Sequence, residues 1–191
     1  MPAGPDAVRR AVLDAAAALF ASNGVTLVTL RDIAEAAQVN LGLINRYLGT
    51  RDDLIRAVFR DLTDQLLAEI RDDPTGMRGF EPDSVMVRWT RVLTYFVVVD
   101  PELAVEVGSA PLHELSAVVT RIYGQDEESA RLRIAQLMAS ALGWRLFEPY
   151  LMAASGLADS SLEEVRMELT HTHRRLAATP LPSPEDPPVD G

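Results

Sequence analysis

Hydrophobic side chains recur every three to four positions along most of the chain, which is the spacing of one face of an α-helix. The first such segment follows Asp6, a candidate N-cap, and ends at Asn23-Gly24, where glycine accepts a left-handed backbone. The same period continues in later segments, at about 54–70, 84–99, 126–154 and 161–179. No repeat and no convincing strand interrupts it. The pattern therefore predicts an all-α fold.

Three capping signals stand close together near the N-terminus. Thr29 with Asp32, and Thr50 with Asp53, each read as a capping box, in which a hydroxyl and a carboxylate satisfy the first free amides of a helix. Asn40 is a further N-cap between them. We therefore expect a short helix after Thr29, a tight turn, a third helix over about 41–47, and a long fourth helix.

Proline and glycine divide the remainder. Residues 72–83 contain two prolines and two glycines and read as a loop. Asp100-Pro101 begins a helix that we expect to break over 108–111, with another following over about 112–123. The tail 180–191 contains five prolines without periodicity, and we expect it to be disordered.

Composition narrows the class of protein. The 191 residues include no cysteine, which excludes disulfides, Cys-ligated metals and thiol catalysis. No segment is apolar enough to cross a membrane and no secretory signal is visible, so we expect a cytoplasmic protein. No metal, cofactor or catalytic site is expected: His171 and His173 diverge on a helix, and no phosphate-binding glycine loop or nucleophile elbow occurs. An enzyme is therefore disfavoured.

The charge is distributed unevenly. The formal net charge is −10, and every basic residue is an arginine. Residues 1–60 carry seven arginines and six acids, whereas residues 61–191 carry eleven arginines and 22 acids. The overall negative charge argues against a nucleic-acid partner. The distribution of charge, however, indicates a neutral-to-basic N-terminal module followed by an acidic remainder.

Residues 29–54 predict a helix-turn-helix, a common DNA-binding arrangement. Ile44 and Leu48 share the inner face of the second short helix, while Asn45 and Arg46 lie on outer rows. Gly42 removes a side chain from that outer face and permits close approach of a base edge. The helix N-termini at Thr29, Asn40 and Thr50 offer amides to phosphate.

The same segment resembles the tetracycline-repressor (TetR) family of bacterial transcription regulators, whose T-x-R-x-I-A motif and later aromatic and basic positions recur here. The matching positions are Thr29, Arg31, Ile33, Ala34, Ala37, Val39, Gly42, Ile44, Tyr47, Arg51 and Leu54. The resemblance covers about residues 6–66. It implies a homodimer on a palindromic operator in double-stranded DNA. It places DNA contacts on Thr29, Arg31, Leu41, Gly42, Leu43, Asn45, Tyr47 and Arg51.

Five positions depart from the family motif. Gln38 replaces the usual turn glycine, which predicts a strained or altered turn. Asn40 replaces serine, a neutral exchange for capping. Asn45 and Arg46 occupy positions where aromatics are common, and Leu48 replaces an aromatic, so we expect Arg46 to take over part of an aromatic phosphate clamp.

The resemblance also implies a division of labour: a DNA-binding domain at 1–50, a connecting helix at 51–71, and a ligand-binding and dimerisation domain at 84–179. An unknown small-molecule effector would bind a largely apolar site with one cationic anchor. Its candidate residues are Trp89, Phe96, Met138, Leu142 and Arg145. The alternative is that these side chains fill the core and that Arg145 pairs with Glu148.

The sequence thus predicts a DNA-binding regulator, a repressor released by a ligand. The alternative is an all-α regulatory or interaction protein without an inducer or without DNA binding. For dimerisation, the helices beginning near Asp126 and Ser161 are the candidates to pair across a two-fold axis.

Overall fold

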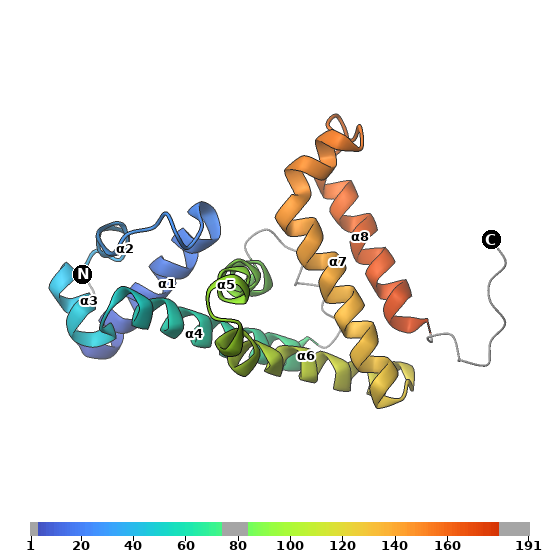
Figure 1. Ribbon diagram of the computed structural model, residues 1–191, viewed down its shortest axis with the longest axis horizontal. Coiled ribbons are helices and arrows are strands. Elements are labelled where there is room, and N and C mark those ends of the chain that lie inside the picture. The colour runs from blue at the N-terminus through green and yellow to red at the C-terminus, as the bar shows by residue number, and fades with distance from the viewer. Residues whose placement is uncertain (1–3, 74–83, 180–191) are drawn as a thin grey trace. The chain divides into compact units, whose positions relative to one another are not determined.

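The computed structural model describes residues 4–73 and 84–179, and within these ranges the chain forms eight helices and no strand (Figure 1). The all-α prediction is confirmed. No helix in the described part is long and apolar enough to cross a membrane. The helices are α1 (Pro5–Asn23), α2 (Leu30–Ala36), α3 (Leu41–Leu48), α4 (Arg51–Asp72), α5 (Val85–Val99), α6 (Pro101–Tyr123), α7 (Glu127–Ala154) and α8 (Leu162–Ala178).

The chain forms two compact units, residues 1–111 and 112–191. The first unit contains α1 to α5 and the first half of α6, with α1 packed on α2, α3, α4 and α5. The loop expected over 72–83 and the disorder expected over 180–191 lie almost wholly outside the described residues. The predicted boundaries at 50, 71 and 84 remain predictions.

The core of the first unit is apolar and closely packed. Burying side chains of this size contributes about 1.5–3 kcal/mol each relative to leaving them in water. The largest side chains with under 2% exposure are Val12, Phe20, Ile33, Ile44, Leu54, Ile55, Val58, Phe59, Leu62, Leu66, Trp89 and Val92. Most come from the helical stripes seen in the sequence, and this explains why the amphipathic pattern located the helices.

An aromatic group joins α4 to α5 inside this core. The rings of Phe59 and Phe96 are stacked with centroids 4.9 Å apart, and the centroid of Trp89 lies 6.4 Å from that of Phe59. The indole Nε1 of Trp89 donates a hydrogen bond to Thr63 Oγ1 at 3.0 Å, which satisfies both buried groups. Trp89 and Phe96 therefore have complete structural roles without a ligand.

The predicted break over 108–111 is wrong, because α6 runs without interruption from Pro101 to Tyr123. A Cβ on Gly108 would lie 3.1 Å from Leu93 Cδ1 and 3.3 Å from Phe59 Cζ. Gly108 thus permits a close approach to α4 and α5 instead of ending the helix. Burial of Pro111 helps to offset its missing amide. Tertiary packing overrides the local helix-breaking signal.

We expect Gly108→Val to lower the free energy of unfolding by about 1–3 kcal/mol, since branched methyl groups would overpack this crossing. Gly143→Val is the matched control, because a Cβ at Gly143 in α7 meets nothing within 4 Å. Denaturant unfolding of both variants measures the difference. Equal stabilities for the two would show that α6 does not need glycine here.

The N-terminus of α1 also differs from expectation. The N-cap is Gly4, with φ of 93° and no side-chain cap, and Asp6 lies in the first turn of the helix. Pro5 explains the shift, since its fixed φ favours the first helical position and its missing amide costs nothing there. The predicted caps at Thr29, Asn40, Thr50, Asp126 and Ser161 are all present.

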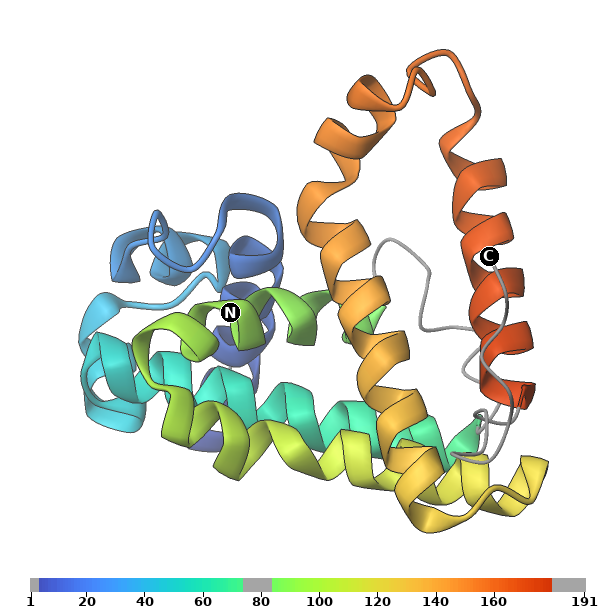
Figure 2. The same cartoon turned by 45° about the vertical axis from the view of Figure 1, so that its right-hand side comes forward.

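In the second unit, α7 and α8 form an antiparallel pair, which is visible in both ribbon views (Figures 1 and 2). Two polar side chains fasten the end of α8. Gln125 Nε2 donates to Ala177 O at 2.8 Å, and Arg133 Nη2 donates to Thr179 O at 2.8 Å. Both side chains are buried, so these bonds satisfy carbonyls that the last helical turn leaves free.

A buried histidine lies between the same two helices. His173 is 7% exposed and its Nε2 lies 3.0 Å from Ser140 Oγ. Desolvation by burial lowers the pKa of His173 from its ordinary value, because the charged imidazolium loses hydration. The folded chain therefore holds this imidazole neutral at pH values where the unfolded chain protonates it.

This pKa shift predicts a loss of stability in acid. The unfolded chain binds a proton at His173 as pH falls below about 6.5, while the folded chain resists it. The free energy of unfolding should therefore fall with decreasing pH, by at most about 1.4 kcal/mol per pH unit. His173→Gln should remove this slope between about pH 6.5 and 5, whereas His171→Gln, at an exposed position, should retain it. Identical slopes for both variants would contradict the assignment.

Candidate nucleic-acid interface

The first turn of α2 is fixed by a complete capping box. Thr29 Oγ1 accepts from the Asp32 amide at 3.3 Å, and Asp32 Oδ2 accepts from the Thr29 amide and hydroxyl, each at 2.8 Å. These bonds favour the charged carboxylate and lower the pKa of Asp32. The Thr29 hydroxyl thus already donates to a carboxylate. The neighbouring Arg31 is exposed.

The N-terminus of α4 repeats this arrangement. Asp53 Oδ2 accepts from the Thr50 amide at 2.9 Å and from its hydroxyl at 2.7 Å, and these bonds lower the pKa of Asp53. The preceding Gly49 has φ of 80°, and a Cβ there would lie 2.6 Å from the same carboxylate oxygen. The turn from α3 to α4 is therefore closed onto Asp53, which fixes where α4 begins.

The turn between α2 and α3 passes through a left-handed residue. Gln38 has φ of 55°, and no other non-glycine residue in the described ranges has a positive φ. The amide of Val39 donates to Ala34 O at 3.0 Å and closes the turn. Strain at Gln38 agrees with the expectation from the missing glycine, because a Cβ is disfavoured in this conformation.

We expect Gln38→Gly to raise the free energy of unfolding by about 0.5–1 kcal/mol. Removing the Cβ relieves the left-handed strain, while the greater freedom of glycine in the unfolded chain offsets part of the gain. Thermal unfolding measures the change. Gln38→Ala, which keeps the Cβ, should show no such gain, and equal behaviour of the two variants would refute the strain.

The third helix divides into an inner and an outer face as predicted. Ile44 is 0% and Leu48 is 6% exposed, whereas Gly42, Asn45 and Arg46 are exposed. The remaining predicted contact residues, Leu41, Leu43 and Tyr47, are partly exposed. Exposed polar groups on a helix whose back is fixed in the core are suited to reading the major groove.

Two neighbours shape this face further. Asn40 Oδ1 accepts from the Gly42 amide at 2.8 Å, and a Cβ on Gly42 would lie 3.2 Å from that oxygen. Gly42 therefore gives room to the N-cap as well as to an approaching base. The Arg46 guanidinium lies 5.6 Å from the centroid of the Tyr47 ring, so the two side chains form one cationic and aromatic group.

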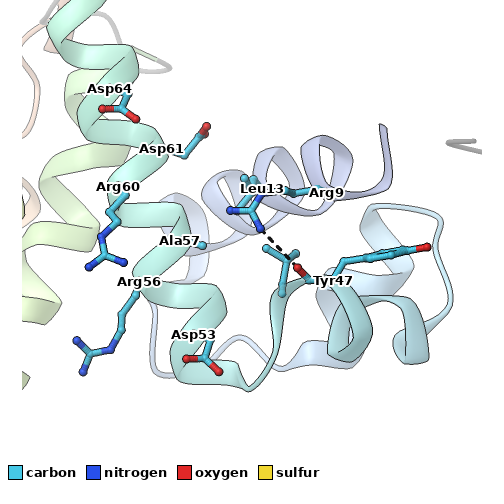
Figure 3. Close-up of a pocket in the computed structure, with 10 residues that line it drawn as sticks. Arg9, Leu13, Tyr47, Asp53, Arg56, Ala57, Arg60, Asp61 and Asp64 are labelled. Atoms are coloured by element: carbon cyan, nitrogen blue, oxygen red, sulfur yellow. Dashed lines mark hydrogen bonds between the residues drawn. The ribbon is translucent and has the colours of Figure 1, made fainter. Parts of the chain in front are cut away.

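An open cleft of about 400 Å³ lies beside the end of α3, between α1 and α4 (Figure 3). Arg9 Nη1 donates to Tyr47 O at 3.5 Å, while the Tyr47 ring extends away from Arg9. Three arginines and three aspartates line the cleft, so its charge favours neither anions nor cations. The lining residues are Arg9, Leu13, Tyr47, Leu48, Asp53, Arg56, Ala57, Arg60, Asp61 and Asp64.

Two of these arginines link α4 to the start of α6. Arg56 Nη2 lies 2.8 Å from Asp100 Oδ2, and Arg60 Nη2 lies 3.9 Å from Glu106 Oε1. The other oxygen of Asp100 accepts from the Leu103 amide at 3.2 Å and caps α6. The Asp100 carboxylate thus both caps α6 and pairs with Arg56 of α4.

Arg51 differs from the other predicted contact residues. Its Nη2 donates to the carbonyls of Val25 and Val28, the latter at 3.1 Å, and its side chain is partly buried. Sequence reasoning missed these partners, which lie 26 and 23 positions away. No local pattern indicates them.

The candidate ligand residues fall into two sets. Trp89 and Phe96 are core residues of the first unit. In the second unit Met138 is 8% exposed, while Leu142 and Arg145 are partly exposed. The two sets belong to separate compact units, and their grouping into one site remains a prediction.

Glu148, the alternative partner considered for Arg145, also bonds to other side chains. Glu148 bonds chiefly to Arg166, whose Nη2 and Nε lie 2.7 and 3.0 Å from its oxygens, and it also accepts from Trp144 Nε1 at 3.0 Å. Burial raises the pKa of Glu148, but these bonds and the charges of Arg166 and Arg145 outweigh it and lower the pKa overall. The charge of Arg145 thus acts on Glu148 together with that of Arg166.

The described residues contain no group of three or more histidines, cysteines or acids placed to hold a metal ion. The described residues instead form two capped short helices, a closed turn between them, and an exposed face on α3. This geometry defines a helix-turn-helix of the kind found in DNA-binding transcription regulators.

Comparison with known proteins identifies the family. Residues 12–58 match the family model described as bacterial regulatory proteins, tetR family. An HTH-type transcriptional repressor of Mycobacterium tuberculosis (strain H37Rv), Rv3405c, is 32% identical over 178 residues, which cover 92% of each chain. The protein belongs to the tetR family of bacterial regulators, and its function is that of a helix-turn-helix transcription regulator rather than an enzyme.

A further sequence relative matches part of the chain, and two solved structures share its fold. The repressor KstR2 of Rhodococcus jostii is 32% identical over 69 residues, which cover 36% of this chain and 34% of its own. The crystal structure of a transcriptional regulator from Rhodococcus sp. RHA1 aligns with a TM-score of 0.63 at 21% identity, over 92% of this chain and 99% of that one. The multidrug binding protein EbrR, complexed with imidazole, aligns with a TM-score of 0.54 at 19% identity, over 93% and 98%.

Proposed function

We propose that this regulator is a repressor that binds a palindromic operator through α3 and is released by a small molecule. The observation that carries the DNA-binding part is the exposed face of α3, on which Asn45 and Arg46 project beside the capped N-termini of α2 and α4. The Mycobacterium tuberculosis relative, a transcriptional repressor, supports repression as the mode of action. Action on DNA places the protein in the bacterial cytoplasm.

Separate roles follow for the candidate contact residues. Asn45 suits adenine and Arg46 suits guanine or phosphate, whereas Tyr47 and the amides at Thr29, Asn40 and Thr50 suit the phosphate backbone. Phosphate contacts set affinity for any sequence, and contacts to base edges set preference among operators.

A shift assay over a range of salt concentrations tests this proposal, using the DNA upstream of the protein's own gene and an unrelated duplex. Arg46→Ala should weaken binding, and the slope of log K against log salt should fall by about 0.9 for each phosphate that the variant leaves unneutralised. Arg131→Ala is the matched control, because it removes an exposed arginine of α7 in the second unit. Equal binding by both variants would exclude a role for Arg46 in contacting DNA.

A homodimer completes the proposed operator complex, because a palindrome matches two-fold symmetry. Exposed apolar side chains on α7 and α8 support this part. They are Leu132, Leu146, Phe147, Tyr150, Leu162, Met167 and Leu176, each between 37% and 68% exposed. Large apolar side chains left in water on two adjacent helices indicate an interface.

The proposed effector is an apolar molecule with an acid group, anchored by Arg145 in the second unit. Complexes of the structural relative EbrR with imidazole and with malachite green support small-molecule binding by this fold. Decanoate and benzoate are suitable probes. They should release DNA from the parent and not from Arg145→Leu, while Arg131→Leu should respond as the parent does. If the probes also release DNA from Arg145→Leu, Arg145 does not anchor the effector.

A second candidate is a regulator of the same fold without an inducer, favoured by the complete packing of Trp89 and Phe96 in the core. Operator binding that no acidic or aromatic probe alters would favour it. An interaction protein that does not touch DNA would show no salt-dependent retention on heparin or DNA.

A further inference from the structure

The start of α2 is connected to the start of α4 through Arg51, the first residue of α4. Its Nη2 donates to two carbonyls of the loop between α1 and α2, those of Val25 and Val28. The side chains of these two valines are 4% and 3% exposed, so the loop is held by packing on one side and by the guanidinium on the other.

The Val28 carbonyl is a sensitive point for such a contact. It belongs to the same planar peptide group as the Thr29 amide, which donates to Asp32 Oδ2 at 2.8 Å. This one peptide group is therefore held at both ends, its oxygen by Arg51 and its N–H by the α2 capping box. Rotating it would break both contacts and turn the first free amides of α2.

We propose that Arg51 is a positioning residue that sets the orientation of the α2 N-terminus, and through it the contacts of the α2 amides with DNA phosphates. The proposal rests on the DNA-binding function proposed above. It replaces the direct phosphate contact that the family resemblance implies for this position.

The hydrogen bonds that the Arg51 guanidinium already makes support this role. One Nη2 group already serves two carbonyls, and the side chain is partly buried, whereas Arg31 and Arg46 are exposed. A guanidinium drawn toward carbonyls of its own chain presents less of its donor edge to a phosphate. Arg51 therefore acts through the peptide group that it fixes.

Arg51→Ala tests the proposal in the full-length chain. We expect affinity for the operator and for unrelated DNA to fall alike, by about tenfold, the equivalent of one charged hydrogen bond, because the α2 amides contact phosphates of any sequence. The slope of log K against log salt should stay that of the parent. The number of active molecules is fixed by titration with excess DNA, so that partial unfolding does not imitate weaker binding.

Three results would overturn the proposal. A slope lowered by about 0.9 would assign Arg51 to a direct phosphate contact. Unchanged affinity per active molecule, with only a lower melting temperature, would leave a purely structural role. Unchanged binding and unchanged stability would remove any role. Arg46→Ala provides the contrast, since it should lower the slope.

Amide hydrogen exchange of the DNA-free chain gives an independent readout. Arg51→Ala should accelerate exchange at Thr29 about tenfold and leave the Asp53 amide, held by the second capping box, as in the parent. If the parent binds no DNA, the proposed function fails, while exchange at Thr29 still decides whether Arg51 fixes this peptide. Unchanged exchange at Thr29 would refute the positioning role.

Discussion

Replacing Phe147 and Tyr150 together with aspartate is expected to convert the protein to monomers and to weaken operator binding by a factor of about 10²–10⁴. Both side chains lie on α7 and are 53% and 68% exposed, so the substitutions remove apolar interface without emptying the core. In a dimer, binding of one half-site holds the second recognition helix at high local concentration, and a monomer loses this advantage.

Analytical ultracentrifugation and a shift assay on the same samples measure the two effects. Val98→Asp and Val105→Asp are the matched controls, because these side chains are 79% and 69% exposed but belong to α5 and the start of α6. They should leave both the mass and the affinity unchanged. A double variant that remains dimeric would exclude this part of α7 from the interface.

Trp89→Ala is expected to lower the free energy of unfolding by about 3–5 kcal/mol. The indole is 0% exposed, packs near Phe59, and donates to Thr63, so its loss leaves a cavity and removes one buried hydrogen bond, while the Thr63 hydroxyl still donates to Phe59 O at 2.9 Å. Denaturant unfolding measures the loss. Trp89→Phe separates the two causes, since it restores most of the volume but not the hydrogen bond.

This pair of variants also decides the role of Trp89 toward an effector. A core residue gives a large loss of stability with alanine and a smaller one with phenylalanine, and it leaves the response to decanoate or benzoate intact in the phenylalanine variant. A ligand residue would lose that response while stability changed little. The second outcome would contradict the packing assigned here.

Local signals in the sequence located most helix ends and the exposed face of α3. Thr29, Asn40 and Thr50 bond within three residues of themselves, so their roles are visible in a short stretch of sequence. The apolar period of α4 likewise reports which side is buried. The strain at Gln38 was predictable because the family motif has a glycine at this turn position and this chain does not.

Features decided by distant residues were not predictable. The continuity of α6 depends on how Gly108 meets Leu93 and Phe59, and the role of Arg51 depends on carbonyls of another segment. Glu148 bonds to Arg166, 18 residues away on α8, and no local pattern in the sequence indicates this partner. In each case the sequence alone points to an explanation from neighbouring residues, because it does not show how the chain packs.

The two carboxylate oxygens of Asp100 connect local unfolding at the start of α6 with the contacts of α4. Since Oδ1 caps the first turn of α6 and Oδ2 pairs with Arg56 on α4, fraying of that turn also releases the arginine. We therefore expect the beginning of α6 and the Arg56 side chain of α4 to loosen together in local unfolding.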